Sequence, residues 1–408
     1  MTRPPGRRRE SAPSPGERCV VEQPARIAFV CEGDAESHHA FSGTAKYIVD
    51  HLRLLGHDVT TINATPDRYL RWLVGALSVR PSREAWRTQF RLGALAADAR
   101  GRRARRLFAP HRDRVDVILQ IGPALQPPGA GTIPYVLFCD WNMALSIRMR
   151  DNPFASTHRL RSADAERINQ RHARIYRSAA AVLTISDHLR DSFMADYGLP
   201  ADRVVTVFAG PNIDLSLIPA TRPAPKDTHR PTILFAGKEF LRKGGDVLVA
   251  AYRQVRRRRP DSRLVILGPR TVDLSEPGIE FAGLLSKNDP RQFAALAALY
   301  AEADVFCLPT RLEPFGIVVL EAMHFGLPCV TSDVWAMPEM VCDGETGFTV
   351  PPGDTDQFAV RLLELLENPA LARRMGEAGR RRAQRLFTWD ATARRMHEAI
   401  QTVVRSDR

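Results

Sequence analysis

The sequence predicts an α/β protein built from two doubly wound, Rossmann-like domains in tandem. The chain has 408 residues, more than one hydrophobic core usually supports. Twelve short apolar runs alternate with segments of helical spacing, a pattern typical of parallel strands covered by helices on both faces. Residues 215–231, rich in Pro, Thr, Ala and Lys, separate the two series as a linker. We expect the domains to face each other across a cleft at the carboxyl ends of their strands.

The N-terminal part begins with a segment that has little to bury. Residues 1–25 are rich in Pro, Arg, Gly and Ser, which predicts a disordered basic tail. The N-terminal domain, 26–214, opens with an apolar strand, a Gly33-containing loop and a helix from Gly43 to Leu55 that Gly56 ends. The strands expected in this domain are 26–31, 58–62, 115–121, 134–139, 181–185 and 204–208.

The second series forms a C-terminal domain, 232–387. Its expected strands are 232–236, 263–267, 279–281, 305–308, 329–332 and 347–350. The helices expected between and after them are 246–258, 289–302, 317–325, 355–367 and 370–387. Residues 388–408 are expected to form a last helix that packs back on the N-terminal domain.

Composition narrows the class of protein. Apolar residues make up 44% of the chain and charged residues 25%, as in soluble globular proteins. No apolar run reaches the roughly 18 residues that a transmembrane helix needs. Arg7-Arg8-Arg9 is not followed by the apolar stretch of a signal peptide, so we expect a cytoplasmic protein. The cysteines have no metal-ligand spacing and are expected to be reduced core residues; they are Cys19, Cys31, Cys139, Cys307, Cys329 and Cys342.

The positive charge is concentrated in one segment. Residues 67–114 hold thirteen Arg against four acidic residues, a net charge of +9, out of +12 for the whole chain. Arg alternates there with aromatic and aliphatic residues such as Tyr69, Trp72, Trp86 and Phe90. This pattern suits a surface that lies on anionic lipid headgroups, and a solvated basic face with core-facing aromatics is the alternative. We find no nucleic-acid-binding motif and expect no nucleic acid partner.

The most informative motif runs from Glu313 to Glu321. Pro314 and Gly316 form a turn that opens a helix at Ile317, and the first amides of a helix have no intrahelical partner. Such a helix start binds phosphate, while the two carboxylates can accept hydrogen bonds from hydroxyls on either side. Hydroxyls flanking a diphosphate describe a nucleotide sugar. Taken alone, a Glu in a loop and a Glu early in a helix are ordinary.

A second cluster follows the strand 232–236. Gly237-Lys238-Glu239-Phe240-Leu241-Arg242-Lys243-Gly244-Gly245 combines glycines with cations at a strand end. The ammonium groups of Lys238 and Lys243 can reach one diphosphate, and the Arg242 guanidinium can fork onto two oxygens. We interpret both clusters as one site, although surface lysines in a turn are the commoner explanation for the second.

Together these segments resemble the donor-binding domain of the family 4 retaining glycosyltransferases, which have the two-domain GT-B architecture. The resemblance is dense over about residues 204–356 and thin in the N-terminal half, where Ser42-Gly43-Thr44 is similar to the family's first loop and helix. It rests on the following segments: Gly210 and Asn212, Gly237 with Arg242-Lys243-Gly244, Gly268, Gly283, Ala303-Asp304-Val305, Glu313-Pro314-Phe315-Gly316, Glu321-Ala322-Met323, Gly326-Leu327-Pro328 and Gly344-Glu345-Thr346-Gly347-Phe348.

The resemblance implies a role for each matching residue. Glu313 would contact the donor sugar or orient the loop around it, and Glu321 would hold the ribose hydroxyls. Lys243 would bind the diphosphate, with Lys238 and Arg242 as further cations. Amides at Phe315, Gly316 and Ile317 would contact sugar and phosphates, and Gly237, Gly43 and Leu320 complete the expected donor-binding set.

The chain departs from the family pattern at two places. Lys238 stands where the family usually has Arg, which keeps the charge and loses the bidentate fork. Asp140-Trp141 follows the strand after which the family often has a catalytic-site His, so the acceptor-side base is left open. His38-His39 in the first loop could face the cleft or solvent.

The leading hypothesis is a retaining glycosyltransferase that moves a sugar from a nucleoside diphosphate sugar to an acceptor hydroxyl. The N-terminal domain would bind the acceptor and the C-terminal domain the donor. Fixed cations would make a metal redundant, so we expect no metal or other cofactor and interpret Asp354-Thr355-Asp356 as a helix N-cap. The alternatives are a sugar-nucleotide epimerase of the same architecture and a non-enzymatic peripheral module with a relic nucleotide site. The acceptor, the sugar, the base and the oligomeric state are left open.

Overall fold

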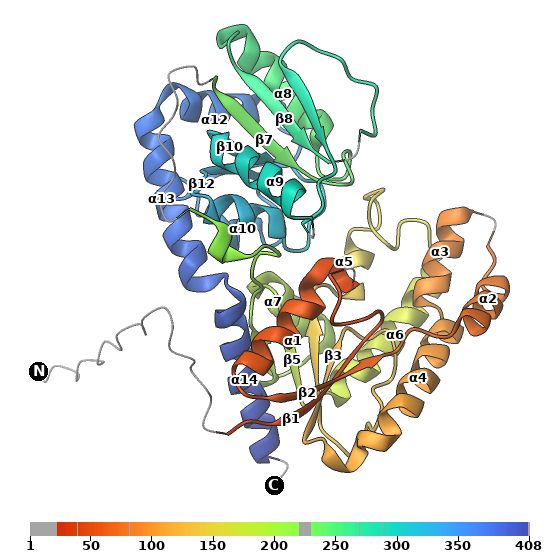
Figure 1. Ribbon diagram of the computed structural model, residues 1–408. Helices are drawn as coiled ribbons and strands as arrows, with labels where there is room; N and C mark the ends of the chain where they lie inside the picture. Colours follow the sequence, from red (N-terminus) through yellow and green to blue (C-terminus); the bar gives the residue numbers. More distant parts are fainter. Residues whose placement is uncertain are drawn as a thin grey trace, which may run out of the picture.

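The structure is a computed structural model that describes residues 23–38, 40–80, 82–219, 230–268, 270–287 and 289–406 (Figure 1). Most of the predicted N-terminal tail and residues 220–229 of the predicted linker therefore lie outside the described residues. Within the described part, the chain forms two six-stranded parallel sheets, which confirms the predicted fold class.

The first sheet has the strand order β2-β1-β3-β4-β5-β6. Its strands are β1 (Arg26–Cys31), β2 (Asp58–Asn63), β3 (Val117–Ile121), β4 (Tyr135–Cys139), β5 (Ala181–Thr184) and β6 (Val204–Thr206). The helices of this half are α1 (Thr44–Leu54), α2 (Arg68–Leu77), α3 (Arg83–Leu92), α4 (Ala94–Phe108), α5 (Met143–Arg148), α6 (Ser162–Ser178) and α7 (Asp187–Tyr197). Short 3₁₀ turns are η1 (Ala40–Gly43), η2 (Ala109–Arg114), η3 (Ala201–Arg203) and η4 (Leu215–Leu217).

The second sheet has the order β12-β11-β10-β7-β8-β9, which is the strand order of a dinucleotide-binding doubly wound domain. Its strands are β7 (Thr232–Ala236), β8 (Arg263–Leu267), β9 (Ile279–Gly283), β10 (Val305–Leu308), β11 (Cys329–Ser332) and β12 (Gly347–Val350). Its helices are α8 (Gly245–Arg258), α9 (Pro290–Glu302), α10 (Ile317–His324), α11 (Met337–Met340), α12 (Thr355–Glu367), α13 (Pro369–Leu386) and α14 (Trp389–Ser406). The order reverses between β7 and β10.

All twelve predicted strands are present. Most are apolar runs that the sheet buries on both faces, whereas the edge strands β2 and β9 are only partly buried. The strand predicted at 204–208 ends early, at Thr206, because Phe208 adopts a left-handed backbone with φ 58° and turns the chain. Among the described cysteines, Cys31, Cys139, Cys307 and Cys329 are buried free thiols. Cys342 is half-buried, and Cys19 lies outside the described residues.

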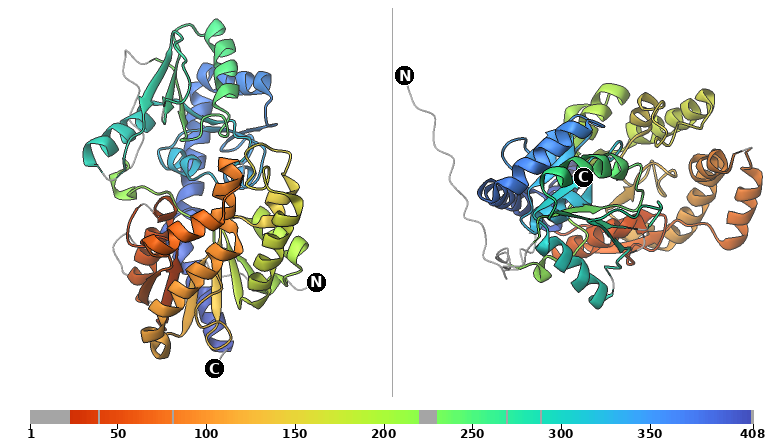
Figure 2. Two further views of the ribbon diagram at one scale, coloured as in Figure 1. Left: turned by 90° about the vertical axis from the view of Figure 1, so that its right-hand side faces the viewer. Right: turned by 90° about the horizontal axis from the view of Figure 1, so that it is seen from above.

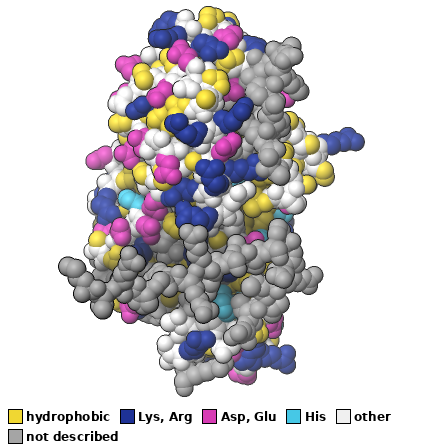
Figure 3. Space-filling model, turned by 90° about the vertical axis from the view of Figure 1, so that its left-hand side faces the viewer, with side chains coloured by type: hydrophobic (Ala, Val, Ile, Leu, Met, Phe, Trp, Pro, Cys, Tyr) yellow, Lys and Arg dark blue, Asp and Glu magenta, His cyan; other side chains and the backbone are white. Residues whose placement is uncertain are grey.

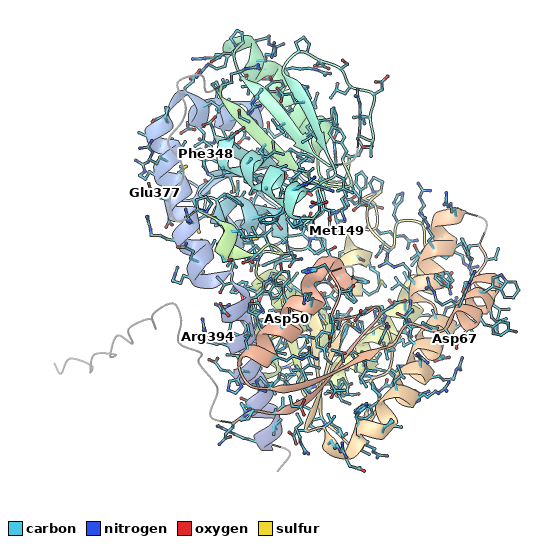
Figure 4. The ribbon with its side chains drawn as sticks, viewed as in Figure 1. Asp50, Asp67, Met149, Phe348, Glu377 and Arg394 are labelled. Atoms are coloured by element: carbon cyan, nitrogen blue, oxygen red, sulfur yellow. The ribbon has the colours of Figure 1, made fainter. Side chains whose placement is uncertain are left out.

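Residues that follow the carboxyl ends of the two sheets touch each other. Asn152, beyond β4, donates from Nδ2 to the carbonyl oxygen of Arg311, beyond β10, at 3.2 Å. Glu339, beyond β11, accepts at 2.7 Å from the amides of Asp187 and of its neighbour His188, at the start of α7. Met149, labelled in Figure 4, marks where the N-terminal half approaches the second sheet. The carboxyl ends of the two sheets therefore face one another.

The last helix ties the halves together. In Figures 1 and 2, α13 and α14 form one column that runs from the second sheet down along the first. α14 packs against α1 and the first sheet, and the Trp389 indole Nε1 donates to the carbonyl oxygen of Pro211 at 2.9 Å. The Trp389 ring stacks on Tyr47 of α1, with centroids 5.6 Å apart. The chain thus crosses back to the N-terminal domain after completing the second sheet.

Candidate active site

Two loops lie at the point where the strand order of the second sheet reverses. The Gly237-to-Gly244 loop follows β7, and the loop that carries Glu313 follows β10. Arg311 joins them, since its guanidinium binds both oxygens of Asp246 at 2.6 and 2.7 Å and its amide donates to the carbonyl oxygen of Arg242 at 3.0 Å. In doubly wound sheets this crevice is the ligand-binding position. The two sequence motifs therefore form one site.

Glu313 and Lys243 form a buried ion pair at this crevice. The Lys243 Nζ lies 2.6 Å from Glu313 Oε2, and both side chains are about one-tenth exposed. Arg242 Nη1 lies 3.6 Å from the same oxygen. Burial raises the pKa of the Glu313 carboxyl, but the positive charges of Lys243 and Arg242 outweigh it, so the net pKa is lowered. Glu313 is therefore ionised at neutral pH, and it fixes the Lys243 ammonium in the site.

The Glu313 ion pair predicts a specific acid sensitivity. Because folding lowers the pKa of Glu313 below its ordinary 4.5, its contribution to stability is present above that pH and is lost as the pH falls through the folded value. Urea unfolding between pH 6 and pH 3 should show a larger loss of unfolding free energy for the unchanged protein than for Glu313→Gln. Equal losses for the two proteins would contradict the assignment.

The other two cations occupy different environments. Arg242 makes hydrogen bonds within the protein. Its Nε donates to Glu239 Oε2 at 2.7 Å, and its Nη1 donates to the carbonyl oxygen of Leu312 at 2.6 Å. It therefore clamps the two loops together. The Lys238 side chain is exposed, whereas the stem of Lys243 packs so closely on Gly237 that a Cβ there would lie 2.6 Å from Lys243 Cδ. Of the three cations, Lys243 is the most buried and the one whose charged group lies within hydrogen-bond distance of Glu313.

The helix α10 begins in the same crevice with an open N-terminus. Gly316 is its N-cap, with φ 85°, and no side chain caps the first turn. A Cβ at Gly316 would lie 2.6 Å from Met337 Cε, so the close backbone turn requires glycine. Phe315 is buried against Phe387, and Leu320 is fully buried. Phe315 can offer a ligand only its backbone, and the Leu320 side chain supports the helix from below.

Glu321 lies one turn further along α10 and is almost fully buried, with 1% of its side chain exposed. Its Oε1 pairs with Lys287, and its Oε2 accepts from the Tyr300 hydroxyl at 3.2 Å. Burial, and next the negative charge of Glu321, raise the pKa of Tyr47 in α1 to about 12. The Glu321 carboxylate of the second domain therefore affects an ionisable group of the N-terminal domain.

Sequence reasoning missed Lys287 and Tyr300. One available signal was that the chain has only five lysines and that Lys287 lies in the loop after β9, four residues beyond its end. Tyr300 gave no signal, because it lies in an ordinary apolar helix, α9.

On the facing sheet, the loop after β1 has a strained backbone. Phe41 and Ser42 adopt φ 49° and 57°, and Gly43, the N-cap of α1, has φ 97°. Asn212 holds this loop by donating from Nδ2 to the carbonyl oxygen of Ser42 at 2.8 Å. Strained, well-supported turns of this kind are concentrated at functional sites. The order of the first sheet also reverses here, between β1 and β3, so Gly43 lies at a ligand-binding position of its own domain.

The acceptor side offers fewer groups. Asp140 follows β4 and is solvent-exposed, yet enough protein surrounds its carboxyl that burial raises its pKa, with Arg91 opposing the shift. The ring of His38 lies edge-on to Tyr47, and His39 lies outside the described residues. In the described part of the chain, no three His, Cys, Asp or Glu side chains gather as metal ligands would. Asp354 accepts from the Gln357 amide at 3.0 Å, which confirms the predicted N-cap.

Comparison with known proteins identifies the C-terminal half. The family model for glycosyl transferases group 1 matches residues 220–382. This chain carries a group 1 glycosyltransferase domain. Both the Lys243 loop and the motif from Glu313 to Glu321 lie within the matched range.

Two curated relatives are each 32% identical to this chain over part of its length. The α-D-kanosaminyltransferase of Streptomyces kanamyceticus is 32% identical over 219 residues, which cover 51% of this chain and 56% of the relative. The α-maltose-1-phosphate synthase of Mycolicibacterium smegmatis is 32% identical over 252 residues, which cover 55% and 64%. The chain thus spans between about half and two thirds of the length of these two relatives.

Solved structures show that the group 1 domain sits in a GT-B fold. Sucrose-phosphate synthase from Thermosynechococcus elongatus superposes with a TM-score of 0.68 at 21% identity, over 94% of this chain and all of the other. Anabaena HepE, solved in complex with UDP and glucose, gives 0.60 at 16% identity, over 93% of this chain and all of that one. At these identities the likeness establishes the architecture.

Proposed function

We propose that this protein is a retaining glycosyltransferase that moves a sugar from a nucleoside diphosphate sugar to an acceptor hydroxyl. One observation carries the proposal: the Glu313–Lys243 ion pair and the open N-terminus of α10 lie together where the second sheet reverses its strand order. The group 1 glycosyltransferase domain at residues 220–382 and the HepE structures with UDP and UDP-glucose support the same donor class.

The geometry fits the charge that such a reaction develops. Most of the activation free energy comes from the negative charge that develops on the departing diphosphate. Preorganised positive groups stabilise this charge. The Lys243 ammonium and the first amides of α10 supply that positive field, and Arg242 holds their loops in place. Glu321 would accept hydrogen bonds from the ribose hydroxyls. We propose that these groups act without a metal, so activity should survive chelation by EDTA.

A thermal-shift panel of uridine, guanosine and adenosine diphosphate sugars tests the donor site. A ligand that binds only the folded state raises the melting temperature by an amount that grows with the logarithm of its concentration relative to its Kd. Donors with one base should therefore stabilise the protein, and the others should not. If no donor raises the melting temperature, the proposal fails. Release of free nucleoside diphosphate that depends on an added acceptor would then separate transfer from epimerisation.

We also propose that the N-terminal domain works at an anionic membrane surface in the cytoplasm. In Figures 1 and 2, α2 and α3 project from the side of this domain, and Asp67, the N-cap of α2, lies far from the second sheet in Figure 4. Tyr69 and Trp72 of α2 are 73% and 68% exposed. No helix among the described residues is long and apolar enough to span a bilayer.

The aromatic residues of segment 67–114 divide between two environments. Trp86 donates from Nε1 to the carbonyl oxygen of Gly75, and Phe90 packs beside Val74, so these rings hold α3 to its neighbours. Tyr69 and Trp72 remain outside. The face of the molecule that carries α13 differs from the Arg-rich segment 67–114, because basic and acidic side chains are interspersed on it (Figure 3).

Replacing Tyr69 and Trp72 together by serine should abolish flotation with phosphatidylglycerol vesicles at low salt. Each large apolar side chain that enters the interface contributes roughly 1.5–3 kcal/mol when fully buried, so binding should weaken by at least tenfold. The matched control is Leu284→Ser with Val360→Ser, which removes two exposed apolar residues from the other domain. Equal flotation of the two variants, or absence of binding by the unchanged protein, would contradict the proposal.

A further inference from the structure

A cavity of about 550 Å³ opens in the N-terminal domain between the start of α4 and one face of α6. None of the proposed donor-site residues lines it. Five arginines line it instead: Arg80, Arg161, Arg167, Arg171 and Arg174. A cavity of this size is large enough for a small organic ligand.

The arginines reach the cavity because of their spacing. Arg167, Arg171 and Arg174 are four and three positions apart on α6, so they share one face of the helix. Arg171 donates from Nη2 to the carbonyl oxygen of Leu92 at the end of α3, which fixes its guanidinium between the helices. Arg80 enters from the end of α2.

The charge of this cluster is not balanced within the protein. Asp164 is the one carboxylate among the described lining residues, and it pairs with Arg161 at 2.9 Å and with Arg167 at 2.6 Å. Asp98 also acts on Arg171, where it opposes the effect of burial on the pKa of the guanidinium. Among the described residues, the buried Arg171 Nε has no hydrogen-bond partner. The protein neighbours of Arg171 thus do not satisfy its guanidinium fully, and such an unsatisfied donor costs stability.

The start of α4 adds further donors. Gly93 is the N-cap of this fifteen-residue helix, and no side chain caps it. Gly93 and Ala94 both line the cavity. Uncapped amides at a helix start favour an anion for the same reason as those of α10, here beside guanidinium groups that can bind two oxygens at once.

We propose that this cavity is a binding site for a phosphate group carried by a larger ligand. Five arginine side chains and the first residues of α4 line it, and phosphate is the common anion that accepts hydrogen bonds from both guanidinium groups and helix N-terminal amides. The group can belong to a soluble phosphate ester or to a phospholipid headgroup, since Arg80 follows α2 and its exposed Trp72. The site does not depend on the donor site, so either proposal can fail alone.

The test compares three proteins with two probes. Arg167→Gln with Arg174→Gln removes two exposed cavity arginines, and Arg102→Gln with Arg106→Gln removes the same charge from an exposed part of α4 outside the cavity. The soluble probe is sn-glycerol 1-phosphate in a calorimetric titration, with glycerol as its uncharged counterpart. The lipid probe is flotation with phosphatidylglycerol vesicles against phosphatidylcholine vesicles.

The cavity variant should lose one bound phosphate or bind it about tenfold more weakly, while the matched variant changes by less than about twofold. If the cavity variant loses binding of sn-glycerol 1-phosphate but still floats with phosphatidylglycerol vesicles, the ligand is a soluble ester. If it loses both, the ligand is the lipid headgroup. If both probes bind the cavity variant as they bind the matched variant, the proposal is overturned. The melting-temperature shift caused by the donor should be equal in all three proteins, which keeps this result separate from the donor site.

Discussion

Lys243→Met should lower kcat/KM for sugar transfer by about 10²–10³-fold, the cost of removing one preorganised charge partner of a developing anion. Lys243 is the buried cation of the crevice and lies 2.6 Å from Glu313. Lys238→Met removes an equal charge from an exposed position in the same loop and should cost less than about tenfold, because a solvated charge is weakly coupled to the site. Steady-state kinetics on both variants measure the difference.

The unpaired carboxylate that Lys243→Met leaves behind needs its own control. Removing one partner of a buried ion pair costs about 3–5 kcal/mol of stability, and part of an activity loss could come from unfolding. The double variant Lys243→Met with Glu313→Gln removes both charges and should recover much of the stability without recovering the rate. Recovery of the rate together with stability would show that Lys243 only supports the fold.

Glu321→Gln should weaken donor binding by about 10–100-fold, since a hydrogen bond to a charged group contributes roughly 1.5–3 kcal/mol. The proposed partners are the ribose hydroxyls. A donor that lacks these hydroxyls should bind the unchanged protein as weakly as the full donor binds Glu321→Gln. The affinity of this shortened donor should fall little further when the protein carries Glu321→Gln. Calorimetric titration of the two donors against the two proteins forms the complete cycle.

Two further variants separate the hydroxyl contact from the present partners of Glu321. Lys287→Met and Tyr300→Phe each remove one group that binds the carboxylate and leave the carboxylate itself in place. Both should bind the donor within about threefold of the unchanged protein, far less than the loss expected for Glu321→Gln. If either matches the loss in Glu321→Gln, the carboxylate acts through its neighbours and the ribose assignment is wrong.

Much of this fold could be predicted because its signals are local. A buried parallel strand is an apolar run in the sequence, and every predicted strand is present, with β1, β7, β8, β10, β11 and β12 matching to the residue. The start of α10 could also be predicted from the sequence, because Pro314 and Gly316 form the turn and Ile317 begins the helix. The pairing of two motifs 70 residues apart followed from the order of strands that a doubly wound sheet imposes.

The roles of individual charged groups required the tertiary structure. Lys238 and Lys243 are equivalent in the sequence, yet one is exposed and the other is buried against Glu313. For Arg242, which is predicted to face the diphosphate, only the structure shows that Nε and Nη1 donate to Glu239 and to the carbonyl oxygen of Leu312 and so join two loops. In segment 67–114, only packing separates the inward Trp86 from the exposed Trp72.

The sequence by itself thus determined the two sheets, their carboxyl-end loops and the motif from Glu313 to Glu321, because backbone conformation and strand burial depend on neighbours along the chain. Only the tertiary structure decided which cation is held in the crevice, that Lys287 and Tyr300 hold Glu321, and that five arginines line one cavity. Those outcomes depend on distances between side chains that are remote in the sequence, and on which of them water still reaches.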